Sequence, residues 1–265
     1  MLGCGRAGPA AVRLGVDRAM AAVEQACRAA LIDAGLPDRV LGNADAAVGL
    51  AGLRRKGAIE QLMARRHPFR SVRYFDDATI ACIGAHGGGD GGIVIVGTGS
   101  VGIAMVDGRE IRVGGYGFPI SDEGSGADLG LRAIRLALRA SDGRAPATPF
   151  TREVMSRFRD DAYEAVSWMD GATATDYATF APLVMQHARD GDPAARRILG
   201  AASEHIGALV RQLIERGAPR IALLGGLAAA MEPWLAPDVQ SLLTPSQGDA
   251  VDGALALARR AAERN

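Results

Sequence analysis

The sequence predicts an α/β protein. Segments with apolar residues at three- and four-residue steps alternate with short apolar runs of strand length, most clearly at 93–96 and 221–224. The pair Asp107-Gly108 stands between two further strand-like runs and is typical of a β-hairpin turn. These patterns favour strands and helices that share a core, with a β-meander near the middle of the chain.

The first third of the chain alternates helix and strand. Val16, Met20, Val23, Cys27 and Leu31 follow the helical period, and Gly35 and Pro37 end that segment. The predicted elements are a helix at 12–34, a strand at 46–52, a helix at 57–65, a strand at 72–75 and a helix at 78–85. The run HGGGDGG at 86–92 follows and is the best candidate for a hinge or domain boundary.

The remaining two thirds predict a β-meander, a group of helices and a last strand. The meander comprises strands at 93–96, 101–106 and 110–113. Helices are expected at 123–141, 151–158, 175–189 and 194–216. A buried strand is expected at 221–224, a short strand near 239–243 and a closing helix at 249–263.

Composition narrows the class of protein. The chain has 265 residues and a formal net charge of +0, from 30 basic and 30 acidic residues. No basic tract stands out in the sequence, so no charge pattern indicates binding to nucleic acid or to an anionic membrane. The apolar runs are too short to span a bilayer, and the first residues lack a secretory signal pattern. Cys4, Cys27 and Cys82 are far apart, which predicts buried free thiols and a cytoplasmic location rather than a disulfide framework.

Several familiar sites are missing from the sequence. There is no GxxxxGK[ST] nucleotide loop and no GxSxG nucleophile elbow. The four histidines are scattered and have no cysteine partner nearby, so we expect no metal site built from protein ligands.

Two short motifs could carry chemistry. In GTGS (97–100), a glycine turn leaves backbone N–H groups free to face a phosphate, and Thr98 adds a hydroxyl; a tight hairpin turn explains the motif equally well. In FDDA (75–78), a carboxylate follows a strand, where a general base is well placed. Taken alone, this motif favours Asp76 or Asp77 as the N-cap of the next helix.

The third motif is GGYGFPISDEGSGADLG (114–130). Glycines let the main chain approach a ligand closely, and Tyr116 offers a ring for stacking. Asp122 and Glu123 are expected where a helix begins, and Ser125 with Asp128 resembles a capping box. Capping is sufficient to explain the acids, but it does not explain the glycines.

The order of these motifs is more specific than any one of them. FDDA, a glycine hinge, GIVIVGTGSVG, the 114–130 segment and finally ALLGGLA together resemble the N-acetylglucosamine/glucosamine kinases. These kinases belong to the BadF/BadG/BcrA/BcrD ATPase family within the actin-like, Hsp70-like sugar kinase superfamily. The resemblance implies a two-lobed actin-like ATPase (ribonuclease H-like) fold. Its N-terminal lobe would be 1–88, completed by a C-terminal helix at 249–265, and its C-terminal lobe would be 89–248.

The same resemblance implies an activity and its residues. The activity is ATP-dependent phosphorylation of an amino sugar, N-acetylglucosamine or glucosamine, at a hydroxyl, with ATP and Mg²⁺ as cofactors. Sugar and nucleotide would be the partners, and a homodimer is left open. By position in the motifs, the base would be Asp77, the phosphate contacts Gly97, Thr98 and Gly99, the sugar contacts Thr98, Gly115, Tyr116 and Asp122, and the adenosine contacts Gly225 and Gly226.

The beginning of the chain departs from the family pattern. Family members start with a β-hairpin that carries DGGGTKT, a first phosphate loop whose acid helps to hold Mg²⁺; here the chain starts MLGCGRAGPA, so the first lobe is expected to be truncated. Ala11 also stands where the family's GPxN segment has asparagine. Either the start codon is placed too far downstream, or this is a truncated paralogue. The non-enzymatic alternative is a degenerate sugar-binding paralogue. A second enzymatic alternative from the same family is an activator-type ATPase of a dehydratase, which needs paired cysteines that Cys4, Cys27 and Cys82 do not supply.

Overall fold

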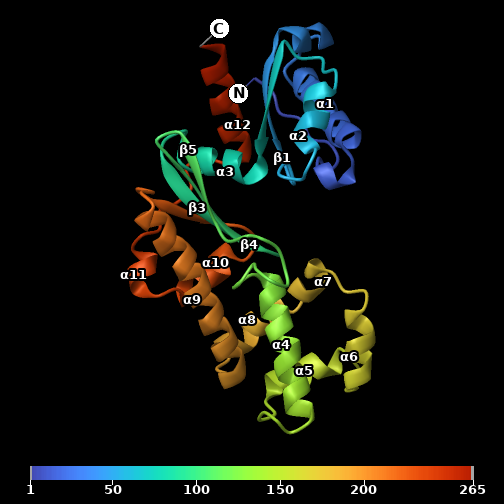
Figure 1. Ribbon diagram of the computed structural model, residues 1–265, viewed down its shortest axis with the longest axis vertical. Helices are drawn as coiled ribbons and strands as arrows, with labels where there is room; N and C mark the ends of the chain where they lie inside the picture. Colours follow the sequence, from blue (N-terminus) through green and yellow to red (C-terminus); the bar gives the residue numbers. More distant parts are fainter. Residues whose placement is uncertain (1, 264–265) are drawn as a thin grey trace. The chain divides into compact units, whose positions relative to one another are not determined.

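The computed structural model describes residues 2–263, which separate into two compact units. The first unit runs to Asp90 and is completed by the chain from Ser246 onward, and the second is Gly91–Pro245. Each unit combines helices with a sheet and has its own hydrophobic core (Figure 1). The predicted α/β class is confirmed.

The first unit is built on two parallel strands, β1 (Asp45–Leu50) and β2 (Ser71–Asp76), paired from Asp45↔Ser71 to Leu50↔Asp76. Met20 of α1, Leu50 of β1 and Leu62 of α2 are fully buried in its core. The helical elements are η1 (Val12–Leu14), α1 (Val16–Asp33), η2 (Asp38–Asn43), α2 (Ala58–Ala64), α3 (Asp77–Ala85) and α12 (Ala250–Ala262).

Helix α12 packs against α3 and β1 within this unit (Figure 1). Glycines make the approach between the two helices very close. A side chain at Gly84 would overlap the backbone at Asp249, and one at Gly253 would overlap the carbonyl of Ile80. Arg260 of α12 also donates to the carbonyl oxygen of Gly88, at 2.6 Å. The C-terminal helix is therefore an integral part of the first unit.

The second unit contains a four-stranded sheet in the order β5-β4-β3-β6. Strands β3 (Gly91–Val96), β4 (Ser100–Val106) and β5 (Arg109–Val113) form the predicted antiparallel meander, and β6 (Ile221–Leu224) pairs parallel with β3. Because β3 and β6 are parallel, with Ile95 opposite Leu224, the segments that follow Val96 and Leu224 emerge at the same edge.

Helices cover this sheet and supply most of the larger core. Helix α9 (Pro193–Glu215) packs on β3, β4 and β5, and α4 (Gly126–Ser141) packs beside it (Figure 1). Phe150, Leu199 and Ile206 are fully buried there. The other helical elements are α5 (Pro149–Ser156), α6 (Ala162–Met169), α7 (Ala174–Ala178), α8 (Ala181–Arg189), α10 (Ala228–Met231), η3 (Glu232–Trp234) and α11 (Pro237–Gln240).

Four features of the local structure differ from the predictions. The helix expected from 123 begins at Gly126, because Ser125 is its N-cap. The helix expected at 175–189 is two helices, α7 and α8, and α6 was missed altogether. The strand expected at 239–243 is the helical turn α11 followed by one isolated bridge, Ile221↔Leu243.

The cysteines and the apolar segments behave partly as predicted. All three cysteines are free thiols, but only Cys82 is buried, while Cys27 is half-buried and Cys4 is exposed. Within residues 2–263, none of the helices combines the length and apolar character needed to cross a membrane.

Candidate active site

Asp76 and Asp77 lie where β2 meets α3 in the first unit. Asp76 is the last residue of β2 and the N-cap of α3, and Asp77 is the first helical residue. The N–H of Ala78 donates to Asp76 Oδ1 at 3.2 Å and to Asp77 Oδ1 at 2.9 Å. Arg54 stands 3.6 Å from the Asp76 carboxylate. The cap position and an ion pair with Arg54 thus belong to Asp76, while Asp77 shares the N–H donor of Ala78.

The electrostatic environment of Asp77 favours a proton acceptor. Asp77 is exposed as a residue, yet its carboxyl group loses part of its hydration against neighbouring atoms. This desolvation, together with the adjacent Asp76 carboxyl, raises the pKa of Asp77 above its ordinary value of 3.8, and the N–H of Ala78 opposes the rise only in part. A carboxylate with a raised pKa binds a proton more readily than an ordinary surface aspartate.

In the second unit, the turn Gly97-Thr98-Gly99 connects β3 to β4 and is fixed by the start of α4. The N–H of Gly126 donates to the Gly97 carbonyl at 2.8 Å, and the N–H of Ala127 donates to the Thr98 carbonyl at 3.2 Å. Within the turn, the N–H of Gly97 donates to the Gly99 carbonyl at 2.9 Å. The carbonyl groups of the turn are therefore occupied, and its shape is set before any ligand binds.

The donors of the same turn are free. The N–H groups of Thr98 and Gly99 have no hydrogen-bond partner among residues 2–263, and Thr98 is exposed. Two neighbouring backbone donors in a rigid glycine turn suit the oxygens of a phosphate group.

Asp122 lies directly against this turn. Its backbone has a φ of 66°, a left-handed conformation that is uncommon outside glycine. Its Oδ1 accepts from the N–H of Gly117 at 3.1 Å, and its Oδ2 lies so close to Gly99 that a side chain at Gly99 would overlap it. Burial of the half-exposed side chain raises the pKa of Asp122; Glu123 adds to the rise, while the N–H of Gly117 and Arg112 counteract it.

The loop that carries Gly115, Tyr116 and Gly117 joins the same cluster through the hydrogen bond from Gly117. Gly115 has a φ of 70°, and a side chain there would stand 2.6 Å from Cβ of Val101, so its glycine is needed for packing within the protein. Gly117 faces open space. The Tyr116 side chain is 75% exposed and pairs with no other aromatic ring of the described chain. Its ring is therefore available to a ligand.

Arg112 of β5 was not predicted as part of this cluster. Its Nη2 donates to the Gly115 carbonyl at 2.7 Å, and its charge helps to hold the pKa of Asp122 down. Only the alternation of β5 could have pointed to it, and alternation alone does not single out one strand residue.

Gly225 and Gly226 follow β6 at the edge where the turn 97–99 follows β3. Gly225 has a φ of 102°, and a side chain there would overlap the Val96 carbonyl, which also accepts from the N–H of Leu227 at 3.0 Å. A side chain at Gly226 would meet nothing within 4 Å. Ligands of open α/β sheets gather at this edge, beyond the carboxyl ends of the strands.

The second unit thus brings together the turn 97–99, Asp122 and the loop 115–117, and it places 225–226 at the same sheet edge, whereas Asp77 belongs to the first unit. Among the described residues, no group of three or more His, Cys, Asp or Glu side chains could hold a metal ion. The free donors, the carboxylate and the exposed ring suit a small polar ligand that carries a phosphate.

Residues 1–258 match the BadF/BadG/BcrA/BcrD ATPase family. The chain belongs to this family. The match extends over both units of the structure, so the resemblance that the ordered motifs indicate is confirmed.

Two curated proteins that are similar in sequence to this chain are sugar kinases by name. It is 40% identical to the glucosamine kinase GspK of Vibrio cholerae, over 97% of this chain and 87% of that protein. It is 31% identical to an N-acetylmuramic acid/N-acetylglucosamine kinase of Clostridium acetobutylicum, over 63% of this chain and 57% of that protein.

Solved structures agree with the fold of the family. A crystal structure described as a putative N-acetylglucosamine kinase of Chromobacterium violaceum has a TM-score of 0.86 and 36% identity, covering 97% of this chain and 90% of that chain. A ROK family glucokinase of Streptomyces griseus, in complex with glucose and AMPPNP, has a TM-score of 0.50 and 17% identity over 96% and 89% of the two chains, a likeness of fold alone. The predicted sugar-kinase type of fold is confirmed.

Proposed function

We propose that this chain is an ATP-dependent kinase that phosphorylates a hydroxyl of an amino sugar, glucosamine or N-acetylglucosamine. The observation that carries the proposal is the contact between the Asp122 carboxylate and a turn with two free N–H donors at Thr98 and Gly99. A carboxylate accepts hydrogen bonds from sugar hydroxyls, and free backbone N–H groups donate hydrogen bonds to phosphate oxygens, so the pair suits a sugar and a nucleotide side by side. The names of the relatives, above all the glucosamine kinase, support this substrate class.

In this proposal each residue has one task. Gly97, Thr98 and Gly99 hold the phosphates of ATP, and Gly225 and Gly226 allow close approach of the adenosine. Asp122 accepts hydrogen bonds from hydroxyls of the sugar, while Gly115 and Tyr116 support the sugar, with the Tyr116 ring over its apolar side. The two compact units are the two lobes of the kinase.

Asp77 is the proposed general base. The sugar hydroxyl oxygen bonds to the γ-phosphorus, the bond from that phosphorus to the β–γ bridging oxygen breaks, and the hydroxyl proton passes to the Asp77 carboxylate. The products are the sugar phosphate and ADP. Mg²⁺ would neutralise the phosphate oxygens. Because the described residues contain no three-ligand cluster, we expect it to be held mainly by ATP and water.

A coupled assay of ADP release over a panel of amino sugars tests the proposal. We expect turnover with glucosamine or N-acetylglucosamine, and a fall in kcat of about 10²–10⁴-fold in Asp77→Asn, with sugar affinity measured by calorimetry nearly unchanged. Asp76→Asn is the matched control, since asparagine also serves as an N-cap, and it should retain most of the rate.

Two results would overturn the proposal. Sugar binding without sugar-dependent ADP release would instead assign a binding protein. Equal rates in Asp77→Asn and the native chain would remove Asp77 as the base.

A further inference from the structure

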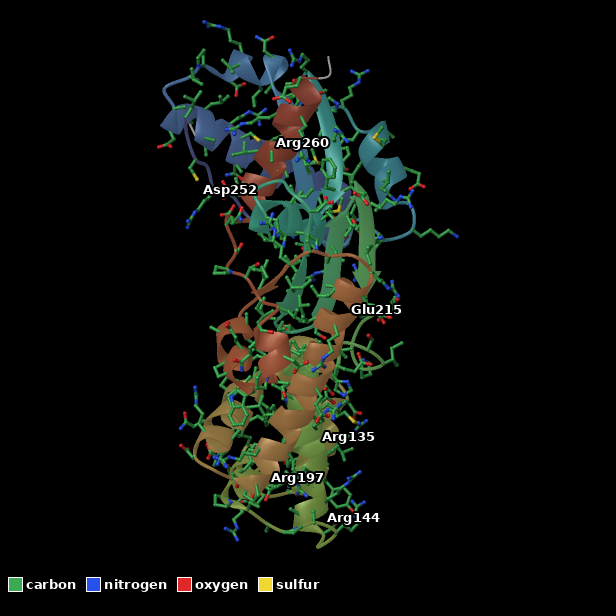
Figure 2. All side chains as sticks on the ribbon, turned by 90° about the vertical axis from the view of Figure 1, so that its left-hand side faces the viewer. Arg135, Arg144, Arg197, Glu215, Asp252 and Arg260 are labelled. Atoms are coloured by element: carbon green, nitrogen blue, oxygen red, sulfur yellow. The ribbon has the colours of Figure 1, made fainter. Side chains whose placement is uncertain are left out.

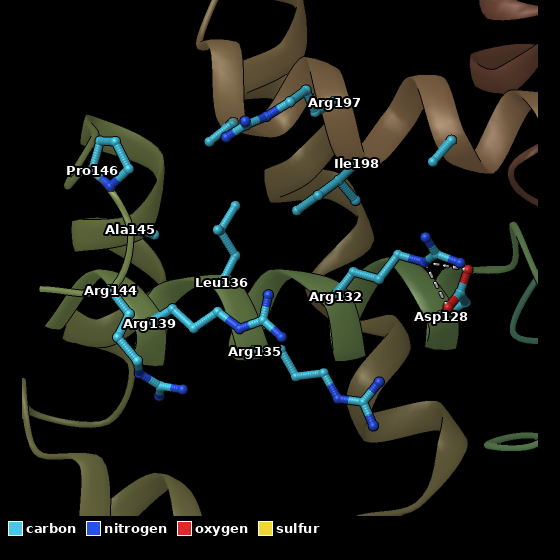
Figure 3. A pocket seen from close by; sticks show the side chains of 12 residues that line it. Asp128, Arg132, Arg135, Leu136, Arg139, Arg144, Ala145, Pro146, Arg197 and Ile198 are labelled. Atoms are coloured by element: carbon cyan, nitrogen blue, oxygen red, sulfur yellow. Dashed lines mark hydrogen bonds and ion pairs between the residues drawn. The ribbon is translucent and has the colours of Figure 1, made fainter. Parts of the chain in front are cut away.

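A cavity lies on the second unit, away from the candidate active site, and is lined by α4, the segment that follows it, and α9 (Figure 3). Its volume is about 660 Å³, within the 300–1,000 Å³ that small-molecule sites usually occupy. Five arginines and one aspartate line it: Arg132, Arg135, Arg139, Arg144, Arg197 and Asp128. Figure 2 shows Arg135, Arg144 and Arg197 in the same region of this unit. None of these residues belongs to the proposed kinase site.

The charges of this cavity are not balanced. Asp128 already accepts from Arg132 at 2.9 Å and from the N–H of Gly124 at 2.9 Å. Arg144 is paired with Asp142, outside the lining. In contrast, Arg135, Arg139 and Arg197 form no ion pair with any described residue, although Arg139 is near enough to Asp142 to lower its pKa. In a chain with a net charge of +0, this local excess is not a consequence of composition.

The excess charge disfavours the free protein. Arg132, Arg135 and Arg139 follow one another at steps of three and four residues, so they share one face of α4, where like charges repel. Arg197 adds a further cation from α9, a helix far from α4 along the chain. A bound anion would remove this repulsion. Guanidinium groups present paired N–H donors that match the oxygens of a phosphate.

The inner surface of the cavity is apolar. Leu136 of α4 and Ile198 of α9 line it together with Pro146, and Ile198 is only 7% exposed. Figure 3 shows Leu136 and Ile198 between the arginines of α4 and Arg197. Inorganic anions gain nothing from such a surface, whereas a ring or other organic body does.

We propose that this cavity binds an organic polyphosphate, a small molecule with at least two phosphate groups on a ring-containing body. The arginines of α4 and α9 hold the phosphates, and Leu136, Ile198 and Pro146 contact the body. The site is independent of the proposed kinase reaction, because it needs neither Asp77 nor the turn 97–99.

Calorimetry on the full chain tests this, and the arginine variant described below separates binding in the cavity from binding in the proposed nucleotide site. The probes are guanosine 5′-diphosphate, a hexose bisphosphate and inorganic tripolyphosphate. We expect one of the two organic probes to bind the native chain more tightly than tripolyphosphate. The variant R135Q/R139Q/R197Q should weaken that binding at least about tenfold, since it removes three charge-assisted contacts.

The matched control is R109Q/R152Q/R216Q, which removes three arginines of the same unit that lie outside the cavity and form no ion pair with described residues. It should leave binding within about twofold. Thermal unfolding checks that both variants fold, and R197Q, a single change on the surface of α9, replaces the triple variant if that one does not.

Three outcomes would overturn the proposal. The first is equal binding by the native chain and the triple variant. The second is tripolyphosphate binding at least as tightly as both organic probes. The third is a single-stranded oligonucleotide or an acidic peptide that binds more tightly than the organic probes and loses affinity in the triple variant. The last would assign the arginines to a macromolecular partner.

Discussion

The contact between Gly99 and Asp122 allows a sharp test of the proposed sugar site. Gly99→Ala adds a single methyl group that would stand 3.2 Å from Cγ of Asp122 and would overlap Oδ2. Gly99 does not have a positive φ, so the substitution strains no backbone angle. Asp122 cannot simply turn aside, because its Oδ1 holds the N–H of Gly117 at 3.1 Å and its backbone is fixed near a φ of 66°. The methyl group therefore displaces the carboxylate.

The size of the effect follows from the bonds that are lost. A hydrogen bond to a charged group contributes about 1.5–3 kcal/mol. If Asp122 binds a sugar hydroxyl, its displacement raises the Kd for the sugar by about 10- to 100-fold. The internal bond from Gly117 is also lost, and overpacking adds strain, so the free energy of unfolding should fall by about 1–3 kcal/mol.

The assay compares sugar affinity and ATP affinity by calorimetry in Gly99→Ala and in Gly97→Ala. A methyl group added at Gly97 would meet no atom within 4 Å, and the backbone of Gly97 does not have a positive φ. The Gly97→Ala variant should therefore keep its sugar affinity within about twofold. Asp122→Asn should reproduce the loss of sugar affinity without a steric clash. Unchanged sugar affinity in a folded Gly99→Ala chain would refute the role of Asp122, whatever happens to ATP.

Two other properties can be checked with the same protein. Because the pKa of Asp77 is raised, partly by Asp76, the rate should fall as pH drops through a value above 3.8, and Asp76→Asn should move this acid limb to lower pH; an acid limb that does not move would exclude their interaction. Burial opposes the ionisation of Asp192, but hydrogen bonds from Thr148 and from the N–H groups of Ala194, Ala195 and Phe150 outweigh it and lower its pKa. Its contribution to stability is therefore present above pH 3.8 and lost as pH falls through the lower folded value. Asp192→Ala should reduce the free energy of unfolding in urea by about 2–4 kcal/mol at pH 7, and a loss that is the same at pH 2 would contradict this origin.

The strands were more predictable than the helix ends. Residues 221–224 are a continuous apolar run between Arg220 and Gly225, and the strand has those bounds. The run at 239–243 misled the prediction, because Pro237 starts a helical turn that buries Val239 against the core. A short apolar run suits a strand and a buried helical turn equally, and tertiary packing decides between them.

The start of α4 shows a different limit. Asp122 and Glu123 look like acids in a first helical turn, yet Ser125 takes the cap position and Asp122 adopts a left-handed backbone outside the helix. No sequence pattern signals that conformation. Likewise, the spacing of Arg132, Arg135 and Arg139 predicts a basic helix face, but only the fold adds Arg197 and turns that face into a cavity.

Capping and ligand contact were rival explanations for the acids of both motifs, and the caps belong to residues other than the two proposed site acids. Asp76 is the N-cap of α3 and Ser125 is the N-cap of α4, whereas Asp77 and Asp122 are the acids of these segments whose pKa is raised. A carboxylate whose only task is capping is stabilised in its charged form by backbone donors, as Asp192 is. In the free protein, desolvation instead disfavours the charged forms of Asp77 and Asp122. A proton taken from a hydroxyl would relieve that cost at Asp77, and hydrogen bonds from hydroxyls would relieve it at Asp122. The two acids that capping does not explain are thus the two to which the proposed function gives a task.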